Sequence, residues 1–332
     1  MDLKCQNCNC YPDDFMINNF WLKLKNKNKP ILALAPMAGF TDSAFRKICK
    51  SYGADVLYSE MASATALFYN QNIKKNTTLD LLKFDGQKEK YYVVQLFGSN
   101  PEHFAVATRI ITKEIKPDGI DINFGCPVPK IIKQGAGSGL MKNLKNSRAV
   151  IEAVLANTNL PVSIKIRTEA GTVKAVDFLK NISDLPVASL MIHGRTLKQG
   201  FAGSADFKII KEAKKYFKGI ILANGGINDL PSAQKALKES GADGLGLARG
   251  VLGRPWLYKE IKKNKISNLK PKQIFKISIN HAELEQAEKG SRGIIEFRKH
   301  LVWYMQGMTG AAKLREQLVQ VKSLANIKKI LK

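Results

Sequence analysis

The chain has 332 residues, too many for one small core, and its hydrophobic fraction of 45% is that of an ordinary globular protein, so we expect one large domain and a smaller one. No apolar run reaches membrane-spanning length, which disfavours a membrane protein. No secretion signal pattern is recognisable and the five cysteines are an odd count, which disfavours a secreted protein built on disulfides, so we expect a cytoplasmic protein. The 53 Lys and Arg exceed the 28 Asp and Glu by 25, which favours a polyanionic partner, most simply a nucleic acid, over a general bias of a chain rich in Lys, Asn and Ile.

Residues 1–29 form an N-terminal extension that does not share the pattern of the chain after it, and we expect it to cover the bottom or side of the main domain. Its "CQNCNC" stretch places Cys5, Cys8 and Cys10 as densely as in a metal site. No clear fourth ligand lies nearby, and the spacing differs from the usual paired C-x-x-C. We therefore predict plain thiols there and assign no metal ligand. Cys49 is expected in the core.

Residues 30–256 alternate between short apolar runs and amphipathic helical patterns. Strands are predicted at 31–35, 55–58, 91–96, 119–122, 162–166, 190–192, 219–222 and 244–247. Helices are predicted between them, at 43–52, 101–115, 147–157, 205–215 and 231–240. This alternation favours an α/β fold of the (β/α)8 TIM-barrel type. An open doubly wound sheet is the alternative, but no G-x-G-x-x-G turn follows the first strand.

Residues 257–332 contain no strand pattern from Lys272 onward, and we predict a C-terminal helical bundle domain with helices at 275–288, 293–306 and 311–331. Turns are expected at 289–291 and 307–310. This segment holds 17 Lys and Arg against six Asp and Glu, so it is the most basic part of the chain per residue.

Polar and small residues follow nearly every predicted strand. The carboxyl ends of barrel strands carry the chemistry of this fold, so we expect these side chains to meet at one face. In chain order they are Pro36, Met37, Ala38 and Gly39; Ser59 and Glu60; Gln95; Asn123 and Cys126; Lys165 and Arg167; His193 and Arg195; Asn224, Gly225 and Gly226; and Ala248, Arg249 and Gly250.

The last two of these stretches, "ANGGI" and "GLARG", place small residues where backbone N–H groups can approach an anion. Loops after the seventh and eighth strands are the recurrent phosphate site of the barrel, so a phosphate-bearing cofactor is expected there. Lys165 must point either into the barrel or at the helices, and either position requires an anion or an electron-rich ring beside it. His193 read alone is also consistent with a structural histidine, but its neighbours Gly194 and Arg195 disfavour this alternative.

The stretch "DINFGCPVPKI" belongs to a longer ordered set of motifs. "APMAGFTDSAFR", "QLFG", "GAGSGLM", "SIKIR", "IHGRT", "ANGGI", "RGVLGRPW" and the tail "RKHLVWYMQGMTGAAKLR" accompany it. Each motif alone is weak, but the ordered set resembles the tRNA-dihydrouridine synthases, most closely their bacterial B-type branch, over roughly residues 30–330.

The resemblance implies a flavin enzyme that uses FMN and NADPH or NADH to reduce uridines of tRNA, with the D-loop as the expected region, and a monomer without membrane contact. Positions that match the family's FMN-binding residues are Pro36, Met37, Ala38, Gln95, Lys165, His193, Asn224, Gly225, Gly226, Ala248 and Arg249. Gly226 and Ala248 stand where this branch commonly has Asp and Gly, and both still offer a backbone N–H. Asn123, Arg167 and Arg195 match positions near the substrate, and Cys126 matches the catalytic cysteine.

Reduction of the C5–C6 bond of uracil needs a hydride at C6 and a proton at C5. A thiol suits the second role because its reference pKa of about 8.5 leaves it largely protonated near neutrality. We predict that Cys126 is this acid, with Gly125 allowing a sharp turn and Pro127 stiffening it. The alternative is a small buried hydrophobic residue.

The basic tail is predicted to hold the tRNA while a base is turned out of its stack, with 257–332 as a tRNA-binding domain. Phosphate contacts are expected from Arg298 and Lys299, with Arg292, His300 and Arg315 as further candidates, whereas Trp303 and Tyr304 are expected mostly in the core. A solvated helix face is the alternative for this charge run. Two other functions remain open: a flavin barrel acting on free small molecules, such as a dihydroorotate dehydrogenase-like enzyme or an ene-reductase, and an RNA-binding protein without catalysis.

Overall fold

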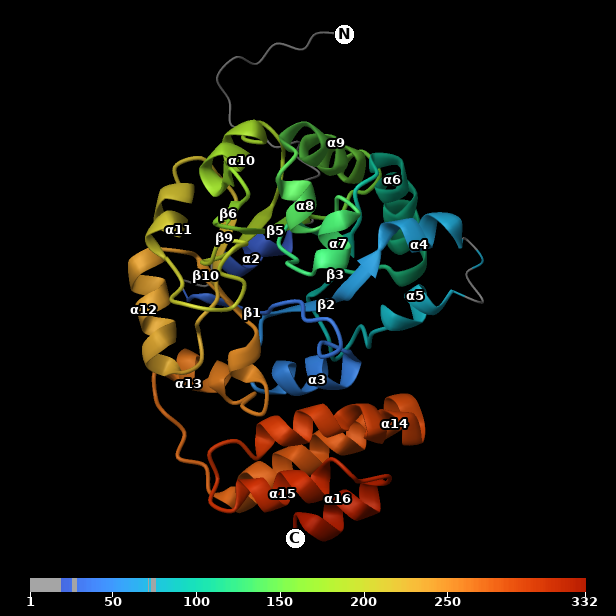
Figure 1. Cartoon of the computed structure of the whole chain (residues 1–332), viewed down its shortest axis with the longest axis vertical. Coiled ribbons are helices and arrows are strands. Elements are labelled where there is room, and N and C mark those ends of the chain that lie inside the picture. The colour runs from blue at the N-terminus through green and yellow to red at the C-terminus, as the bar shows by residue number, and fades with distance from the viewer. Residues whose placement is uncertain (1–18, 26–28, 71, 73–75) are drawn as a thin grey trace.

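The computed structural model describes residues 19–25, 29–70, 72 and 76–332. Its centre is a closed barrel of parallel strands in the order β1-β10-β9-β8-β5-β4-β3-β2, so the predicted (β/α)8 barrel is confirmed and the open doubly wound sheet is wrong (Figure 1). The barrel strands are β1 (Ile31–Leu34), β2 (Val56–Ser63), β3 (Tyr92–Phe97), β4 (Gly119–Asn123), β5 (Val162–Arg167), β8 (Ser189–His193), β9 (Ile220–Asn224) and β10 (Gly244–Leu247). A two-stranded hairpin, β6 (Glu169–Ala170) with β7 (Val173–Lys174), follows β5.

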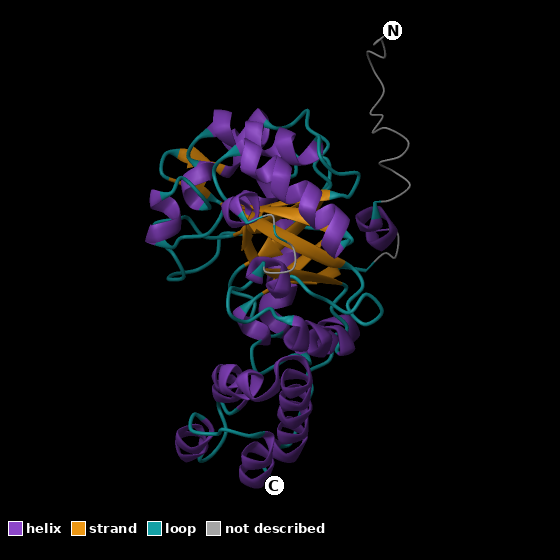
Figure 2. Ribbon diagram, turned by 90° about the vertical axis from the view of Figure 1, so that its right-hand side faces the viewer, coloured by secondary structure: helices purple, strands orange, loops and turns teal. Residues whose placement is uncertain are grey.

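Helices cover the outside of the barrel between successive strands (Figures 1 and 2). They are α3 (Ser43–Ser51), α4 (Ala64–Tyr69), α5 (Thr77–Leu81), α6 (Pro101–Ile110), α7 (Pro129–Lys133), α8 (Ser138–Met141), α9 (Leu144–Leu155), α10 (Ala175–Asn181), α11 (Lys208–Ala213), α12 (Leu230–Ser240) and α13 (Leu257–Lys263). A π-helical turn over Ile111–Ile115 extends α6. Among the described residues, no helix is long and apolar enough to cross a membrane.

Side chains alternate between the inside of the barrel and the helices, because successive residues of a strand face opposite sides. In β5, Ile164 and Ile166 are buried in the core between strands and helices, whereas Lys165 and Arg167 line a pocket at the barrel mouth. Lys165 therefore points into the barrel, which decides between the two orientations that the sequence leaves open.

The short helix α2 (Phe20–Lys25) packs against the amino ends of the strands. Its Phe20, Trp21 and Leu24 are buried with Val93, Leu222 and other residues that fill the lower barrel interior. The described part of the N-terminal extension thus closes the barrel at the end opposite the predicted site. Cys5, Cys8 and Cys10 lie outside the described residues, whereas Cys49 is fully buried as predicted.

The C-terminal helices form a separate layer beside α3 and α13 (Figure 1). They are α14 (Pro271–Tyr304), α15 (Ala311–Leu318) and α16 (Leu324–Ile330). The backbone of α14 is non-helical at Gly290, within the predicted turn at 289–291. The predicted single helix at 311–331 is wrong, because the chain breaks after Leu318 and Ser323 caps a new helix by accepting a hydrogen bond from the Asn326 N–H.

Residues near the predicted boundary at 256/257 pack into the cores of both parts. Leu257, Tyr258 and Ile261 of α13 belong to the core of the barrel. The helical layer has its own core, which includes Ile294, Phe297 and Leu301 of α14 and also Trp256, the residue before α13. The segment between α13 and α14 therefore joins the two parts.

Candidate active site

A pocket of about 390 Å³ opens at the carboxyl ends of the barrel strands. All the predicted site residues except Arg298 and Lys299 line it: Pro36, Met37, Ala38, Gln95, Asn123, Cys126, Lys165, Arg167, His193, Arg195, Asn224, Gly225, Gly226, Ala248 and Arg249. Residues from all parts of the barrel sequence thus meet in one cavity, as expected when strand ends carry the site.

The Cys126 turn is held by side-chain and backbone contacts on both sides. Asn123 Oδ1, at the end of β4, accepts hydrogen bonds from the backbone N–H groups of Gly125 (3.0 Å) and Cys126 (2.9 Å). The carbonyl of Cys126 accepts from the Ser138 N–H at 3.1 Å. Cys126 itself is a free, half-buried cysteine. These bonds hold the thiol at the pocket wall.

The "GAGSG" motif supports the same turn. Gly137 has φ +58, and a Cβ there would lie 2.8 Å from Cys126 Cβ, so only glycine lets this segment approach the cysteine. The predicted role of Gly125 needs correction. Its φ is not positive, and a Cβ would have ordinary contacts of 3.6 Å, so the turn does not depend on a left-handed conformation at Gly125.

Four cationic side chains, Lys165, Arg167, Arg195 and Arg249, line the pocket. Burial, followed by repulsion from Arg167, lowers the pKa of Lys165 to about 8. Burial also lowers the pKa of Arg167 to about 10, although Arg167 Nε donates to the Gly125 carbonyl at 2.8 Å. Among the described residues no acceptor lies within hydrogen-bond distance of the Lys165 ammonium. The pocket therefore favours an anionic ligand.

His193 is held neutral inside this cationic surrounding. Burial and then the charges of Lys165 and the neighbouring arginines lower its pKa to about 2. Its Nε2 lies 3.4 Å from Nη1 of Arg195, which can only donate, so Nε2 is the acceptor and the ring proton belongs on Nδ1. A neutral imidazole can orient a ligand at the wall without adding positive charge.

Close backbone approach shapes the pocket wall at the ends of β9 and β10. Gly225 has φ +100, and a Cβ at this position would lie 2.4 Å from Cδ2 of His193. Asn224 donates from Nδ2 to the Gly246 carbonyl at 2.7 Å, which holds the ends of β9 and β10 together. These small residues leave room for a planar or phosphate-bearing group beside the neutral histidine.

Apolar residues that the sequence interpretation missed complete the pocket: Phe40, Met61, Phe201 and Trp303. Arg249 lies over the ring of Phe201 at 4.6 Å from the centroid, and Phe201 is 58% exposed, so it stands at the mouth. Trp303, expected mostly in the core, is half-buried on α14 and brings the C-terminal layer to the pocket. A search of the strand ends does not find these residues. Phe40 and Phe201 lie in loops, Met61 lies within β2 beyond a register shift, and Trp303 belongs to the C-terminal layer.

The predicted phosphate-binding residues of α14 have different environments. Lys299 is partly exposed and its ammonium lies 5.4 Å from the centroid of the Phe40 ring. Arg298 donates from Nε and Nη2 to the Val321 carbonyl at 2.8 and 2.7 Å, which holds the turn between α15 and α16. His300 is fully buried, so its predicted phosphate contact is wrong. Lys299 thus has the more accessible charge.

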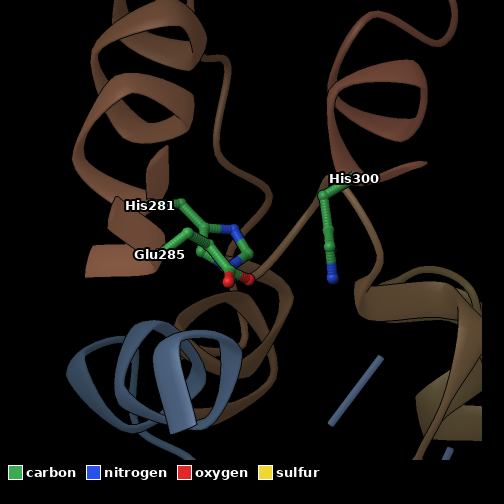
Figure 3. Close-up of side chains that lie close together, drawn as sticks. All are labelled: His281, Glu285 and His300. Atoms are coloured by element: carbon green, nitrogen blue, oxygen red, sulfur yellow. The ribbon is translucent and has the colours of Figure 1, made fainter. Parts of the chain in front are cut away.

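A second polar cluster lies buried where α14 meets α3. His281, Glu285 and His300 offer ligand-type atoms within 4.8 Å of one another (Figure 3). His281 Nε2 and Glu285 Oε1 are 3.7 Å apart, and His281 Nδ1 is 3.1 Å from the hydroxyl of Tyr304. Burial, and then repulsion from Asp42, raises the pKa of Glu285 to about 9, which favours a neutral carboxyl beside neutral histidines.

The ammonium of Lys289 adjoins this cluster. It lies 3.5 Å from Glu285 Oε2 and donates to Asp42 Oδ2 at 2.5 Å and to Glu296 Oε2 at 3.0 Å. Asp42 also caps α3 by accepting from the Phe45 N–H. The space beside Glu285 already holds a cation, so we interpret the cluster as a polar core that joins the helical layer to the barrel.

Comparison with known proteins identifies a family and individual proteins whose sequences are similar to this chain. The profile of the protein family described as Dihydrouridine synthase (Dus) matches residues 33–332. The chain is 34% identical to the Probable tRNA-dihydrouridine synthase 1 of Synechocystis sp. over 305 residues, covering 90% of this chain and 84% of the relative. It is also 34% identical to the tRNA-dihydrouridine synthase B of Shewanella oneidensis over 291 residues, covering 85% of this chain and 87% of the relative.

Solved structures share the fold at low sequence identity. The old yellow enzyme homologue from Zymomonas mobilis has a TM-score of 0.50 and 13% identity, over 70% of this chain and 88% of that one. The histamine dehydrogenase from Rhizobium sp. has a TM-score of 0.53 and 13% identity, over 78% of this chain and 48% of that one. At these identities the likeness concerns the barrel alone.

Proposed function

The chain belongs to the dihydrouridine synthase family, oxidoreductases that act on uridine in tRNA, and we propose that it uses FMN and a nicotinamide reductant, NADPH or NADH, to reduce the C5–C6 bond of D-loop uridines. The observation that carries this proposal is the meeting, in one pocket, of a thiol, four cations and a glycine-lined wall. Its counterpart in the sequence is the ordered motif set over roughly residues 30–330.

FMN fits the residues that are present. Its phosphate carries negative charge, which Arg249 and the backbone of Gly225 and Gly226 would receive at the carboxyl ends of β9 and β10. Lys165, a poorly solvated ammonium without a hydrogen-bond acceptor among the described residues, would balance the charge of the reduced ring system or contact the ribityl chain. The neutral His193 would orient the ring edge. When bound and reduced by the nicotinamide, FMN supplies the hydride for C6 of uracil.

The side chains of this protein supply the remaining steps. Cys126 donates a proton to C5, where negative charge develops as C6 gains hydride, so both atoms of the former double bond end with one added hydrogen. Asn123 keeps the thiol at the pocket wall through the N–H of Cys126. Its amide also donates weakly to Met61 Sδ at 3.7 Å, and this hydrogen would turn to the uracil edge when the base binds. Arg167 and Arg195 line the same pocket and would hold the anionic substrate by charge.

The uridine must be turned out of its stack to reach this depth. Lys299 and Arg298 on α14 are the proposed phosphate contacts of a tRNA-binding helical domain, and Trp303 of the same helix extends to the pocket. The domain that holds the RNA therefore also forms part of the chamber in which the base reacts. We propose a monomeric enzyme that acts in the cytoplasm.

Two measurements test this function. The purified protein should be yellow, and heating should release a chromophore with the mass of FMN; release of FAD, or no flavin uptake on reconstitution, contradicts the cofactor. The reconstituted enzyme with NADPH should form dihydrouridine in unmodified tRNA and should leave free uridine and orotate unchanged. Turnover of the free pyrimidines in place of tRNA would make it a flavin barrel for small molecules.

A further inference from the structure

Asp121 lies beneath the pocket and has no place in the chemistry described so far. It precedes Asn123 by two residues on β4, so both side chains face the barrel interior. Asp121 is fully buried, and its two carboxylate oxygens accept separate hydrogen bonds, from Ser163 Oγ at 2.6 Å and from Gln95 Nε2 at 2.7 Å. Both of its oxygens are thus held by side chains of the neighbouring strands β3 and β5.

A chain of hydrogen bonds connects this carboxylate to the Cys126 turn. Gln95 donates to Asp121, and Gln95 Oε1 accepts from Asn123 Nδ2 at 2.9 Å. Asn123 Oδ1 in turn accepts from the N–H of Cys126 at 2.9 Å. Three side chains from β3 and β4 thus link the floor of the barrel to the backbone that carries the thiol.

The direction of this chain is fixed at both ends, by the carboxylate of Asp121 and by the backbone N–H groups of the Cys126 turn. A carboxylate can only accept, so Gln95 must present its NH2 group to Asp121 and its oxygen to Asn123. Asn123 must then present its own NH2 to Gln95 and its oxygen to the Cys126 turn. Without the carboxylate, the amide of Gln95 can rotate and turn its NH2 toward Asn123 Nδ2. Asn123 then loses its acceptor on Gln95, and the side chain that holds the Cys126 turn is fixed less firmly.

We propose that Asp121 is a positioning residue for Cys126, acting through Gln95 and Asn123 to fix the place of the thiol at the pocket wall. The inference rests on the proposed role of Cys126 as proton donor. Burial raises the pKa of Asp121 to about 6, although the hydrogen bonds from Ser163 and Gln95 favour the charged form. The Asp121 carboxyl is therefore still ionised at neutral pH. Displacement of a reacting group by about 1 Å costs on the order of 10²-fold in rate.

Three variants separate the hydrogen-bond direction from the charge. Asp121→Leu keeps the branched shape and removes both acceptors. Asp121→Asn removes the charge but can still accept from Gln95 while it donates to Ser163. Ser163→Ala is the matched control, because it removes the other hydrogen bond of Asp121 and leaves the chain to Cys126 intact. Gln95→Met breaks the same chain one link nearer to the thiol and replaces Asp121→Leu in the alkylation assay if that variant does not fold; its oxidation rate is not compared, because Gln95 is also a proposed FMN contact.

The readouts are the alkylation rate of Cys126 by iodoacetamide, followed on its own peptide by mass spectrometry, and the oxidation of pre-reduced enzyme by tRNA. In Asp121→Leu we expect alkylation to be several-fold faster as the turn loosens, and oxidation by tRNA to slow by about 10²-fold. In Asp121→Asn and Ser163→Ala, the alkylation rate and the rate of oxidation by tRNA should both stay within about threefold of wild type, well below the roughly 10²-fold loss expected for Asp121→Leu. Reduction of the enzyme by NADPH should be unchanged in Asp121→Asn.

Two outcomes overturn the inference. Alkylation and oxidation rates in folded Asp121→Leu that equal those of Ser163→Ala would show that the carboxylate does not position the thiol. An Asp121→Asn variant as slow as Asp121→Leu would show that charge matters and hydrogen-bond direction does not. If Cys126→Ala itself is oxidised by tRNA at the wild-type rate, the proposed function of Cys126 fails, which is distinct from a failure at Asp121 alone.

Discussion

Replacing Gly225 with Ala tests whether close approach of the backbone to His193 shapes the cofactor wall. The native residue has φ +100, and the new Cβ would lie 2.4 Å from Cδ2 and 2.8 Å from Nε2 of His193. Both distances are below any ordinary contact, so the imidazole or the β9 end must move. Because His193 is only 7% exposed, it has little free space into which to shift.

The expected cost has two parts. A left-handed conformation for a residue with a Cβ costs about 1–2 kcal/mol. Overpacking of a filled site adds about 1–3 kcal/mol. Gly241→Ala is the matched control, since Gly241 has φ +57 at the end of α12 and a Cβ there would meet nothing within 4 Å, so this variant should show the first cost alone.

The assay combines urea denaturation of the apoprotein with titration of FMN by flavin fluorescence. Gly225→Ala should be less stable than Gly241→Ala, and if the overpacking falls on the bound state its FMN affinity should drop by about 5- to 150-fold. Gly241→Ala should bind FMN as wild type does. Equal stability and equal FMN affinity in the two variants would refute the reasoning that the Gly225 position is shaped for the cofactor.

Three further predictions concern charged residues. Burial and then repulsion from Arg167 lower the pKa of Lys165 to about 8 in the folded chain, compared with about 10.4 in unfolded chains. Between these pH values the unfolded state binds more protons, so the stability of the apoprotein rises with pH. Lys165→Met should lose this rise when urea denaturation is compared at pH 8 and 10, and an unchanged rise would contradict the prediction. Burial and then repulsion from Asp42 raise the pKa of Glu285 to about 9, so the folded state holds one more proton than the unfolded state between about pH 5 and 9. The contribution of Glu285 to stability therefore falls as pH increases. Glu285→Gln should cost less stability at pH 8.5 than at pH 5, and the opposite order would exclude a neutral carboxyl. Lys299→Ala should lower the slope of log affinity for tRNA against log salt by about 0.7–0.9, and Lys235→Ala, on the outer face of α12, should leave it unchanged; equal slopes in both variants would remove Lys299 from the interface.

The barrel and the main outline of the pocket could be predicted from the sequence because both follow from local regularities. Apolar runs alternate with amphipathic helices, and every second residue of a strand faces the interior, so Lys165 and Arg167 reach the same cavity. The parallel arrangement then places the carboxyl ends of the strands at one face. These regularities do not depend on contacts between distant segments.

Features that depend on contacts between distant segments could not be predicted in this way. The helical periodicity of 311–331 continues without interruption, yet Arg298 holds the Val321 carbonyl and the chain breaks there. The place of Trp303 in the pocket depends on how α14 packs against the barrel. The strand β2 runs on to Ser63 through a register shift between Tyr58 and Met61, so Ser59 and Glu60 lie within the strand and not after it.

The role of Asn123 shows the same limit at the site itself. A sequence motif places the asparagine three residues before the cysteine, and substrate contact is the simplest interpretation. The structure adds that its side-chain oxygen accepts two hydrogen bonds from backbone N–H groups of the turn. Such a dual use of one amide depends on side-chain orientation, which the order of residues does not specify.

The central claim is that Cys126 gives the proton to C5 of the uracil, and single-turnover oxidation of pre-reduced enzyme by saturating unmodified tRNA tests it most directly. The flavin absorbance reports the reaction, and reduction of the same enzyme by NADPH serves as the internal control. Cys126→Ala should be reduced at a near-normal rate, whereas its oxidation by tRNA should slow by about 10²–10⁴-fold, the usual contribution of a general acid. Oxidation of Cys126→Ala at the wild-type rate across pH would contradict the account and leave the Cys126 turn with a structural role only.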